Sequence, residues 1–382
     1  MEKIAIIGAN SFQNPLILKA KELGYETHVF AWQCGDIGER TADVFYPISI
    51  TEKEEILEVC RKIKPAAVLS IGSDLAMLTV NYVAQRLGLP CNDEVCVKNT
   101  TNKVSMRQCF LEHGIPVPGF VKVDASDALK KIQGLSYPLI VKPTDRSGSR
   151  SITLVQEKSA LGEAVRQAVE DSFEKKAIVE EYIEGEEYSC EAITFQGQHR
   201  ILALTKKYTT GDPHYIETGH MEPSGLSEEL VKKVEAQITG ALEALGIQNG
   251  ASHSEFRIDK TGKIGIIEIG ARMGGDCIGS HLVEISTGYD FVRMVIEVGM
   301  GKEPDFTRVR EPKTAVIRFL MDPEDVKKME DVREKYQDQI QYVSEIETKL
   351  HPVIDSSSRY GYYILALDDR EQAKEILEDD KA

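Results

Sequence analysis

The stretch HSEFRIDKTGKIGIIEIGAR, residues 253–272, has the pattern of a β-hairpin, with two candidate strands on either side of the turn signal Lys-Thr-Gly-Lys. Glu255 and Glu268 interrupt otherwise apolar positions of these strands. A loop of two or four residues would place the glutamates directly opposite each other, whereas a three-residue loop would place them on different faces. Like charges directly opposed on a sheet are destabilising, so we expect a positive group between them.

A divalent cation is the positive group that best suits two carboxylates. Mg²⁺ prefers carboxylate oxygens and is usually held by one or two of them together with substrate phosphates. The hairpin therefore predicts a metal site at Glu255 and Glu268, in preference to two solvated glutamates on an exposed face. Arg272, four residues beyond Glu268, is expected to add a second positive group at the same end.

A second hairpin, LIVKPTDRSGSRSITLV at residues 139–155, carries features suited to phosphate. Lys142 closes an apolar run, and the loop that follows is made of small residues whose backbone N–H groups can approach an anion. Lys103 lies in the first turn of an expected helix, where a positive charge is unfavourable unless an anion is near. Taken singly, each lysine fits a surface position and the loop fits a flexible turn.

The acidic stretch AIVEEYIEGEEYS, residues 177–189, is an apolar strand that runs into a short linker. A linker with exposed backbone groups is suited to hydrogen-bonding an adenine edge, and Glu187 is suited to accepting both ribose hydroxyls. A solvated acidic loop is the alternative interpretation in a protein as acidic as this one.

Composition limits the classes of function. The chain has 382 residues, 42% apolar and 28% charged, which is typical of a soluble protein of two to four domains. A formal net charge of −16 argues against nucleic acid as a partner but not against a nucleotide. The sequence shows neither an apolar run long enough for a membrane nor a signal peptide, so we expect a cytoplasmic protein. Seven scattered cysteines without a CxxC pair predict reduced, structural thiols.

Alternating strand and helix patterns up to about residue 98 predict a parallel sheet covered on both faces. The first turn, GANSFQNP, lacks GxGxxG, so a dinucleotide site is not expected there. A small α+β unit, antiparallel hairpins, a long helix at 227–245 and a trailing α+β segment follow. The expected domain boundaries are 1–98, 99–185 with a lid at about 116–183, 186–305 and 306–382.

The order of these features resembles the ATP-grasp superfamily over roughly residues 1–305. Within that superfamily, EIGARMGGDCIGSHLVEISTGYD (268–290) is most similar to the carboxylate–amine ligases, including L-amino acid ligases, which are related to biotin carboxylase and to the ATP-grasp domains of carbamoyl-phosphate synthetase. The resemblance implies a mixed α/β and α+β fold. A Rossmann-like domain would precede a two-lobed ATP-grasp fold, and a small C-terminal α+β extension would follow.

The resemblance also implies a role for each matching residue. ATP phosphates would contact Lys103 and Lys142 under a mobile loop of Ser147, Gly148 and Ser149, while the adenine would lie against Glu180, Glu181 and Ile183 and the ribose would be held by Glu187. Glu255 and Glu268 would bind Mg²⁺, or Mn²⁺ in its place. Arg272 would stabilise an acyl phosphate. Two departures stand out: Gly270 occupies a place where relatives often have Asn, and the loop has one glycine where some relatives have several.

The implied reaction joins a small-molecule carboxylate to an amine, at least one of them expected to be an amino acid, through an acyl phosphate with release of ADP and phosphate. Candidates for contact with the substrates are Glu217, His220, Gly274, Gly275 and Asp276. His253 shares a strand face with Glu255 and is either a supporting residue behind it or a structural histidine. No residue is an obvious general base. The alternatives are another ATP-grasp chemistry, such as carboxylation or formylation of a purine precursor or a carbamoyl-phosphate-synthetase-like reaction, and a non-catalytic nucleotide-binding protein. Relatives commonly form homodimers, for which the sequence has no independent signal.

Overall fold

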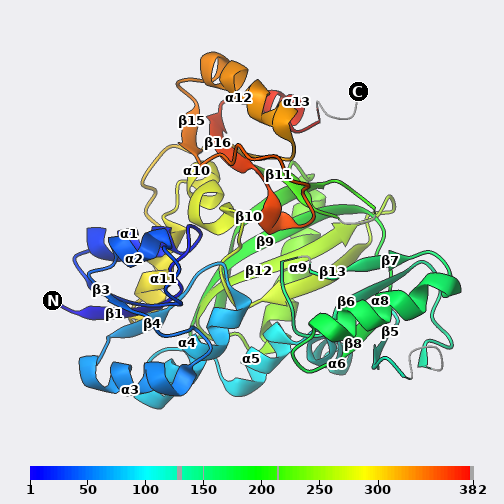
Figure 1. Cartoon of the computed structure of the whole chain (residues 1–382), viewed down its shortest axis with the longest axis horizontal. Helices are drawn as coiled ribbons and strands as arrows, with labels where there is room; N and C mark the ends of the chain where they lie inside the picture. The colour runs from blue at the N-terminus through cyan, green and yellow to red at the C-terminus, as the bar shows by residue number, and fades with distance from the viewer. Residues whose placement is uncertain (127–130, 149, 213–214, 379–382) are drawn as a thin grey trace.

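Three β-sheets organise the part of the chain that the computed structural model describes, namely residues 1–126, 131–148, 150–212 and 215–378 (Figure 1). The first sheet lies near the N-terminus, the second carries the 139–155 hairpin and the third runs through the middle of the molecule. Figure 1 shows the second sheet and its helix set off to one side of the third.

The N-terminal sheet is parallel throughout, as predicted. Its strands in spatial order are β3 (Val44–Tyr46), β2 (Glu26–Phe30), β1 (Lys3–Ile7) and β4 (Ala67–Leu69). One face is covered by α1 (Asn14–Glu22) and by α11 (Phe291–Gly299), and the other by α3 (Lys53–Ile63) and α4 (Asp74–Leu87). The sequence predicts α1, α3 and α4, but α11 arrives from a distant part of the chain. The short helix α2 (Ile37–Thr41) follows β2.

Two helices connect this domain to the rest, where the sequence suggests one. They are α5 (Glu94–Thr101) and α6 (Lys103–Glu112), separated at Asn102. The Asn102 side chain accepts a hydrogen bond from the Ser105 N–H (3.1 Å) and so caps α6. Lys103 therefore lies in the first turn of a helix, as predicted.

The second sheet is antiparallel and small. Its strands in spatial order are β5 (Phe120–Val123), β8 (Ala177–Glu181), β6 (Leu139–Pro143) and β7 (Thr153–Val155). Leu139 pairs with Val155, which confirms the predicted hairpin. The apolar face of α8 (Lys158–Asp171) packs on one side of the sheet and completes its core.

The third sheet has eight antiparallel strands among the described residues. In spatial order they are β13 (Ile264–Gly270), β12 (Gly250–Ile258), β9 (Glu186–Phe195), β10 (Gln198–Thr209), β11 (Glu217–Glu222), β14 (Thr314–Leu320), β16 (Gly361–Leu367) and β15 (Ile340–Val343). Helix α9 (Glu228–Leu245) covers one face. Helix α11 packs on the other, so its apolar side chains join this sheet to the N-terminal one.

The C-terminal residues form the predicted strands and helices, but these strands continue the third sheet. β14 pairs with β11 through contacts such as Gly219 with Arg318, and β16 pairs with β14. The extension also contains α12 (Pro323–Lys335), the short η2 (Ser356–Ser358) and α13 (Arg370–Glu378). Without β14, β11 would present an unpaired edge, which folded proteins avoid. Between the two parts lie η1 (Ile278–Leu282) and α10 (Val283–Thr287).

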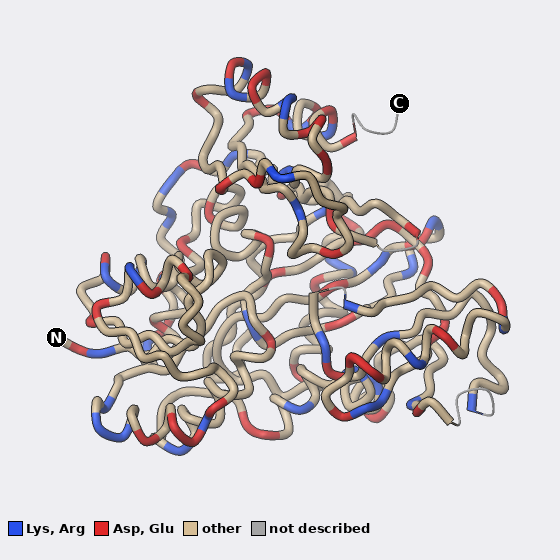
Figure 2. Tube along the Cα trace, in the orientation of Figure 1, with Lys and Arg blue, Asp and Glu red and all other residues tan. Residues whose placement is uncertain are grey.

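Acidic and basic residues are interspersed along the helices and loops of all three regions (Figure 2). In the described residues, no helix combines the length and the apolar character needed to cross a bilayer.

Candidate active site

A cavity of about 330 Å³ is lined by residues from all three regions of the fold. The N-terminal domain contributes Phe12, Gly72 and Asp74, the second sheet contributes Lys142 and the loop after it, and the third sheet contributes most of the charged groups. A smaller cavity of about 90 Å³ adjoins it. The residues that line both cavities are Lys142, Ile152, Lys207, Glu217, Glu255 and Ile267. The two cavities are therefore parts of one site.

Glu255 on β12 pairs directly with Glu268 on β13, as the sequence predicts. The loop between the two strands, however, does not have the expected two or four residues. Ile258 pairs with Ile264, which corresponds to an odd-numbered loop and would leave the glutamates on different faces. A β-bulge adds Ile267 to β13 and restores the pairing. Bulges of this kind occur often beside active sites, where they redirect a side chain.

A lysine lies against each glutamate. Lys207 Nζ is 2.5 Å from Glu255, and Lys103 Nζ is 2.9 Å from Glu268. About a quarter of each glutamate side chain is exposed to the cavity (26% and 25%). Burial alone would raise the pKa of Glu255, but Lys207 and His253 hold that pKa well below its usual value. The Glu255 carboxylate is thus prepared to carry negative charge into the cavity.

The donor set fits Mg²⁺ bound partly by phosphate. Glu255 and Glu268 offer hard oxygens from opposite strands, and both face the main cavity. In the described ranges, no cluster of three or more His, Cys, Asp or Glu side chains is arranged to hold a metal. Two carboxylates complemented by phosphate and water are the usual environment of Mg²⁺ in phosphate-binding proteins.

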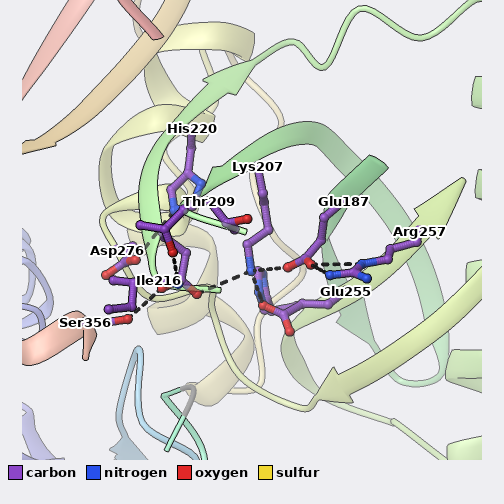
Figure 3. A network of polar contacts seen from close by, with 12 residues as sticks. Glu187, Lys207, Thr209, Ile216, His220, Glu255, Arg257, Asp276 and Ser356 are labelled. Carbon is purple, nitrogen blue, oxygen red and sulfur yellow. Dashed lines mark hydrogen bonds and ion pairs between the residues drawn. The ribbon is translucent and has the colours of Figure 1, made fainter. Parts of the chain in front are cut away.

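Lys207 is the central cation of the site, and the sequence analysis missed it. Its Nζ lies 2.5 Å from Glu255, 3.2 Å from Glu187 and 3.7 Å from Glu217 (Figure 3). Burial would lower the pKa of Lys207, but the three carboxylates raise it well above its usual value. The signal was present in ILALTKKYT, because alternation along a strand must turn one of two adjacent lysines inward.

Lys142 lies where the sequence places it, at the end of β6, and it lines both cavities. It forms an ion pair with Glu180 (3.2 Å), and Arg107 Nε donates to the same carboxylate (2.5 Å). Burial would raise the pKa of Glu180, but Arg107 and Lys142 lower it to about 2. Glu180 thus lines the smaller cavity as a carboxylate whose negative charge is balanced by Arg107 and Lys142. Arg107 also donates to the Ile267 carbonyl at the bulge (2.8 Å).

The smaller cavity is lined by both apolar and charged side chains. Six of its fourteen lining residues are apolar or aromatic, namely Ile140, Ile152, Tyr182, Ile183, Tyr215 and Ile267, and the other eight are charged. The Glu181 carboxylate accepts hydrogen bonds from the Gly119 and Ser136 backbone N–H groups, so it is occupied in the fold. The Glu187 carboxylate is held by Arg257 Nη2 (2.8 Å) and by Lys207.

The loop after Lys142 forms one wall of the main cavity. Ser147 and Gly148 line it together with Arg146 and Arg150. Ser149, also expected in this wall, lies outside the described residues. Lys103 Nζ donates to the Arg146 carbonyl (2.7 Å) while it pairs with Glu268. One lysine thus connects the predicted phosphate loop to a predicted metal ligand.

Arg272 reaches the cavity but is anchored from the N-terminal domain. Its Nε and Nη2 atoms donate to the two oxygens of Asp74 (2.9 and 3.0 Å). A side chain at position 270 would place its Cβ 2.8 Å from Asp74 Oδ1. The Asp74 carboxylate therefore occupies the space that a larger residue at Gly270 would need. This contact gives a physical reason for the glycine where relatives often have Asn.

Gly274 was expected to contact a substrate, but its backbone N–H is already occupied within the fold. That N–H donates to the buried Glu191 carboxylate (3.0 Å), while Gly275 lines the cavity. Glu191 also contacts His253 Nδ1, and His253 Nε2 lies 3.3 Å from Glu255. Burial would lower the pKa of His253, but Glu191 raises it to about 9. His253 thus links the turn after Arg272 to a predicted metal ligand.

Three further predicted residues gather at the end of the cavity next to the C-terminal extension. His220 Nε2 lies 3.5 Å from Asp276 Oδ2. The Asp276 carboxylate accepts two hydrogen bonds from Arg359 (3.0 and 2.6 Å). Glu217 accepts a hydrogen bond from the Ser356 hydroxyl (2.6 Å). Arg359 and Ser356 were not predicted, because nothing local in the sequence indicates that the C-terminal segment returns to the site.

The second and third sheets form a small lobe and a larger lobe, and lysines and paired carboxylates lie between them. This arrangement is typical of proteins that hold a phosphorylated ligand between two lobes. Residues 135–280 match a family model described as the ATP-grasp domain. Residues 135–280 of this chain are therefore an ATP-grasp domain.

Known proteins with similar sequences include alanine–anticapsin ligase of Bacillus subtilis, 27% identical over 282 residues that cover 66% of this chain and 59% of the relative. D-alanine–D-alanine ligase of Clostridium perfringens is 30% identical over 207 residues, 50% of this chain and 64% of the relative. The chain thus spans about three-fifths of the length of these curated relatives.

A solved structure with a similar fold is that of L-amino acid ligase from Bacillus licheniformis. The two folds superpose with a TM-score of 0.85 at 24% sequence identity, and the match covers 99% of this chain and 96% of the other. It includes the N-terminal domain and the C-terminal extension as well as the two lobes. This likeness concerns the fold alone. The assignment of the site residues rests on the contacts and distances described above.

Proposed function

We propose that this protein is an ATP-dependent carboxylate–amine ligase that forms an amide or peptide bond between two small molecules, at least one of them an amino acid. The main support for the proposal is that Lys142, Lys207 and Glu255 line both cavities, so that the two cavities form one site. The smaller cavity suits a nucleoside, and the larger one offers charged groups for phosphates, a metal ion and two substrates.

In this proposal the nucleoside occupies the slot beside Tyr182 and Ile183, with Glu187 on the ribose. Its phosphates extend past Lys142 toward Lys103, under the loop that contains Ser147 and Gly148. Basic side chains and small-residue loops stabilise phosphate oxygens through charge and through backbone N–H groups. Mg²⁺ held by Glu255 and Glu268 would screen the phosphate charge; Mn²⁺ suits the same donors.

The chemistry takes two steps. A carboxylate oxygen attacks the γ-phosphorus of ATP, the bond to the β-phosphate oxygen breaks, and ADP leaves. The nitrogen of an amine then attacks the acyl carbon, the bond to the phosphate oxygen breaks, and the nitrogen loses a proton. Lys207 and Arg272 offer positive charge where these oxygens become more negative. Arg272 follows β13 and lines the main cavity together with Glu255 and Glu268.

The similar sequences support the amide-forming reaction, because the names of alanine–anticapsin ligase and D-alanine–D-alanine ligase state that those enzymes join amino-acid substrates. Carboxylation or formylation of a purine precursor, or a carbamoyl-phosphate-synthetase-like reaction, remains the second candidate.

ADP release tests the proposal. The protein is incubated with ATP, Mg²⁺ and pairs of the common amino acids and small carboxylates, and new amides are sought by mass spectrometry. ADP release that requires two organic substrates, with formation of an amide, is the expected result. ADP release that depends on bicarbonate or formate would favour the second candidate. ATP binding without turnover across the panel would leave a non-catalytic nucleotide-binding protein.

A further inference from the structure

Arg107 on α6 is fully buried and contacts two different sheets. Its Nε atom donates to the Glu180 carboxylate on β8 (2.5 Å), and its Nη2 atom donates to the Ile267 carbonyl on β13 (2.8 Å). Glu180 and Ile267 both line the smaller cavity, in which we place the nucleoside. One side chain therefore bridges the second and third sheets at the cavity that both of them line.

The Ile267 carbonyl belongs to the β-bulge that restores the pairing of Glu255 with Glu268. The residues on either side of Ile267 pair with β12, whereas Ile267 has no partner residue there. A bulge leaves its extra residue outside the ladder, and here Arg107 supplies a donor to it. The Ile267 carbonyl and the Glu268 N–H belong to one planar peptide unit, so a donor that holds this carbonyl also fixes the backbone at the start of Glu268.

The carboxylate of Glu268 is held from the same helix. Lys103 and Arg107 have the spacing i, i+4, so the two side chains share one face of α6. Lys103 Nζ lies 2.9 Å from the Glu268 carboxylate and also donates to the Arg146 carbonyl (2.7 Å). Arg107 thus holds the peptide unit before Glu268, and Lys103 holds its side chain. Helix α6 sets both the position and the direction of a predicted metal ligand.

Stability alone gives a weak reason for this arginine. Arg107 and Glu180 are each 2% exposed, and the removal of two such charges from water is costly enough that apolar side chains of similar volume often stabilise a fold as well or better. Arg107 Nη1 is also buried and makes no hydrogen bond with another described residue, which is unusual in a folded protein. The arrangement therefore favours a role in geometry.

We propose that Arg107 is a positioning residue that makes metal binding at Glu268 depend on the nucleotide in the smaller cavity. This inference rests on the proposed function, which places the nucleoside beside Glu180 and the metal ion at Glu255 and Glu268. A nucleotide held between the second and third sheets keeps Glu180 and Ile267 within reach of one guanidinium. The guanidinium then holds the bulge, and the bulge aims Glu268 at the metal ion.

The test measures how much a metal ion improves nucleotide binding. ADP is titrated into the protein by calorimetry in EDTA, then with Mg²⁺ and with Mn²⁺, and the ratio of the affinities with and without metal is the metal-dependent gain. The wild type should show a gain of at least about 10-fold, within the usual range of coupling between two ligands.

Arg107→Lys keeps a positive charge beside Glu180 but lacks the planar fork that reaches two partners at once. The gain should fall to about 2-fold or less, because loss of a residue that orients a metal ligand typically costs about 10- to 100-fold in metal affinity. The ADP affinity in EDTA should change much less, because Lys142 remains paired with Glu180. The Mg²⁺ concentration for half-maximal ADP release should rise, with the KM for ATP at saturating Mg²⁺ unchanged.

The double variant Arg107→Met with Glu180→Gln removes both charges of the buried pair together. It should lose the gain as well, and because the gain is a ratio of two ADP affinities, a change in nucleotide binding alone leaves it intact. Arg166→Lys, the same substitution at an exposed position of α8, is the matched control and should keep the wild-type gain.

A purely structural role for Arg107 predicts a different pattern. The variants would lower the melting temperature and weaken ADP binding by the same factor with and without metal, so that the gain persisted; that result would overturn the proposal. A wild type without a metal-dependent gain would overturn it too. Because calorimetry needs no turnover, a protein that bound ADP but formed no amide would contradict the ligase function, and the gain would still decide the role of Arg107.

Discussion

Asp74 and Arg272 are 198 residues apart in the sequence and form an ion pair with two hydrogen bonds, at 2.9 and 3.0 Å. Asp74 begins helix α4 of the N-terminal domain, and Arg272 follows β13 of the large sheet. The pair fixes the side chain that we expect beside the reacting acyl group, and it does so from a different domain. The N-terminal domain therefore takes part in the site through a charge as well as through packing.

This pair leads to the first prediction. Arg272→Ala should preserve ATP binding and abolish product formation, and Asp74→Ala should lower kcat in the same direction because Arg272 loses its anchor. The two losses should not add in the double variant, with a coupling of about 1–3 kcal/mol. Single-turnover kinetics and ATP titrations measure both quantities. Additive losses would show that the residues act independently, and wild-type kcat in Arg272→Ala would remove Arg272 from the mechanism.

Glu268→Gln should abolish Mg²⁺-dependent turnover, because the variant removes half of the charge that the two opposed carboxylates offer to a metal. ADP release across a Mg²⁺ titration provides the measurement. Glu229→Gln, on the exposed face of α9, is the control and should behave as the wild type. Retention of the wild-type Mg²⁺ dependence in Glu268→Gln would exclude Glu268 from the metal site.

Lys142→Ala should weaken the binding of ATP and ADP by about 10- to 100-fold, the range expected when a hydrogen bond to a charged group is lost. The fold should survive, because Arg107 continues to neutralise the buried Glu180. Calorimetric titration with each nucleotide measures the effect, and Lys158→Ala, an exposed lysine at the start of α8, is the comparison. Nucleotide affinities that match the wild type would contradict the assignment of Lys142.

Glu222 gives a prediction about stability that does not depend on the function. It is fully buried on β11 and accepts hydrogen bonds from Thr205 and Ser286 (both 2.6 Å). Burial raises the pKa of Glu222 from 4.5 to about 7. Between these pH values the unfolded chain releases a proton that the folded chain keeps, so the free energy of unfolding falls as the pH rises.

Glu222→Gln should remove that fall, which amounts to about 3 kcal/mol for a shift of this size. Denaturant unfolding between about pH 5 and about pH 8 should show the wild type losing stability relative to the variant. The exposed Glu330→Gln should follow the wild type. Parallel curves for Glu222→Gln and the wild type would mean that Glu222 is ionised in the folded protein throughout.

Much of the fold follows from local patterns in the sequence. The apolar periodicity of α3 and α9 and the short apolar runs of β1 and β2 identify these elements close to their observed bounds. The pairing of Glu255 with Glu268 is also predictable, although for an incomplete reason. The expected even-numbered loop is absent, and the bulge at Ile267 compensates for it. A bulge depends on hydrogen bonding between strands and leaves no clear mark in one of them.

The residues that the sequence does not reveal are those whose partners lie far along the chain. Asp74 has a meaning only beside Arg272, and Arg359 only beside Asp276. Helix α11 is missed for a similar reason, because its wide apolar surface packs between two sheets that come from distant parts of the chain, while Arg293 and Glu297 form its polar side. Lys207 differs, since a charge inside an apolar strand is a local feature that the sequence displays directly.

The continuity of the third sheet through β11, β14 and β16 limits how this scaffold can be redesigned. The segment that carries Arg359 cannot be exchanged as an independent module, because its flanking strands supply the hydrogen bonds that complete the sheet. A chimera that replaces only residues 344–360 keeps this framework, whereas one joined near residue 306 must match the register of β14 with β11. Libraries intended to alter this wall of the main cavity should therefore vary side chains within that shorter segment and leave the strands unchanged.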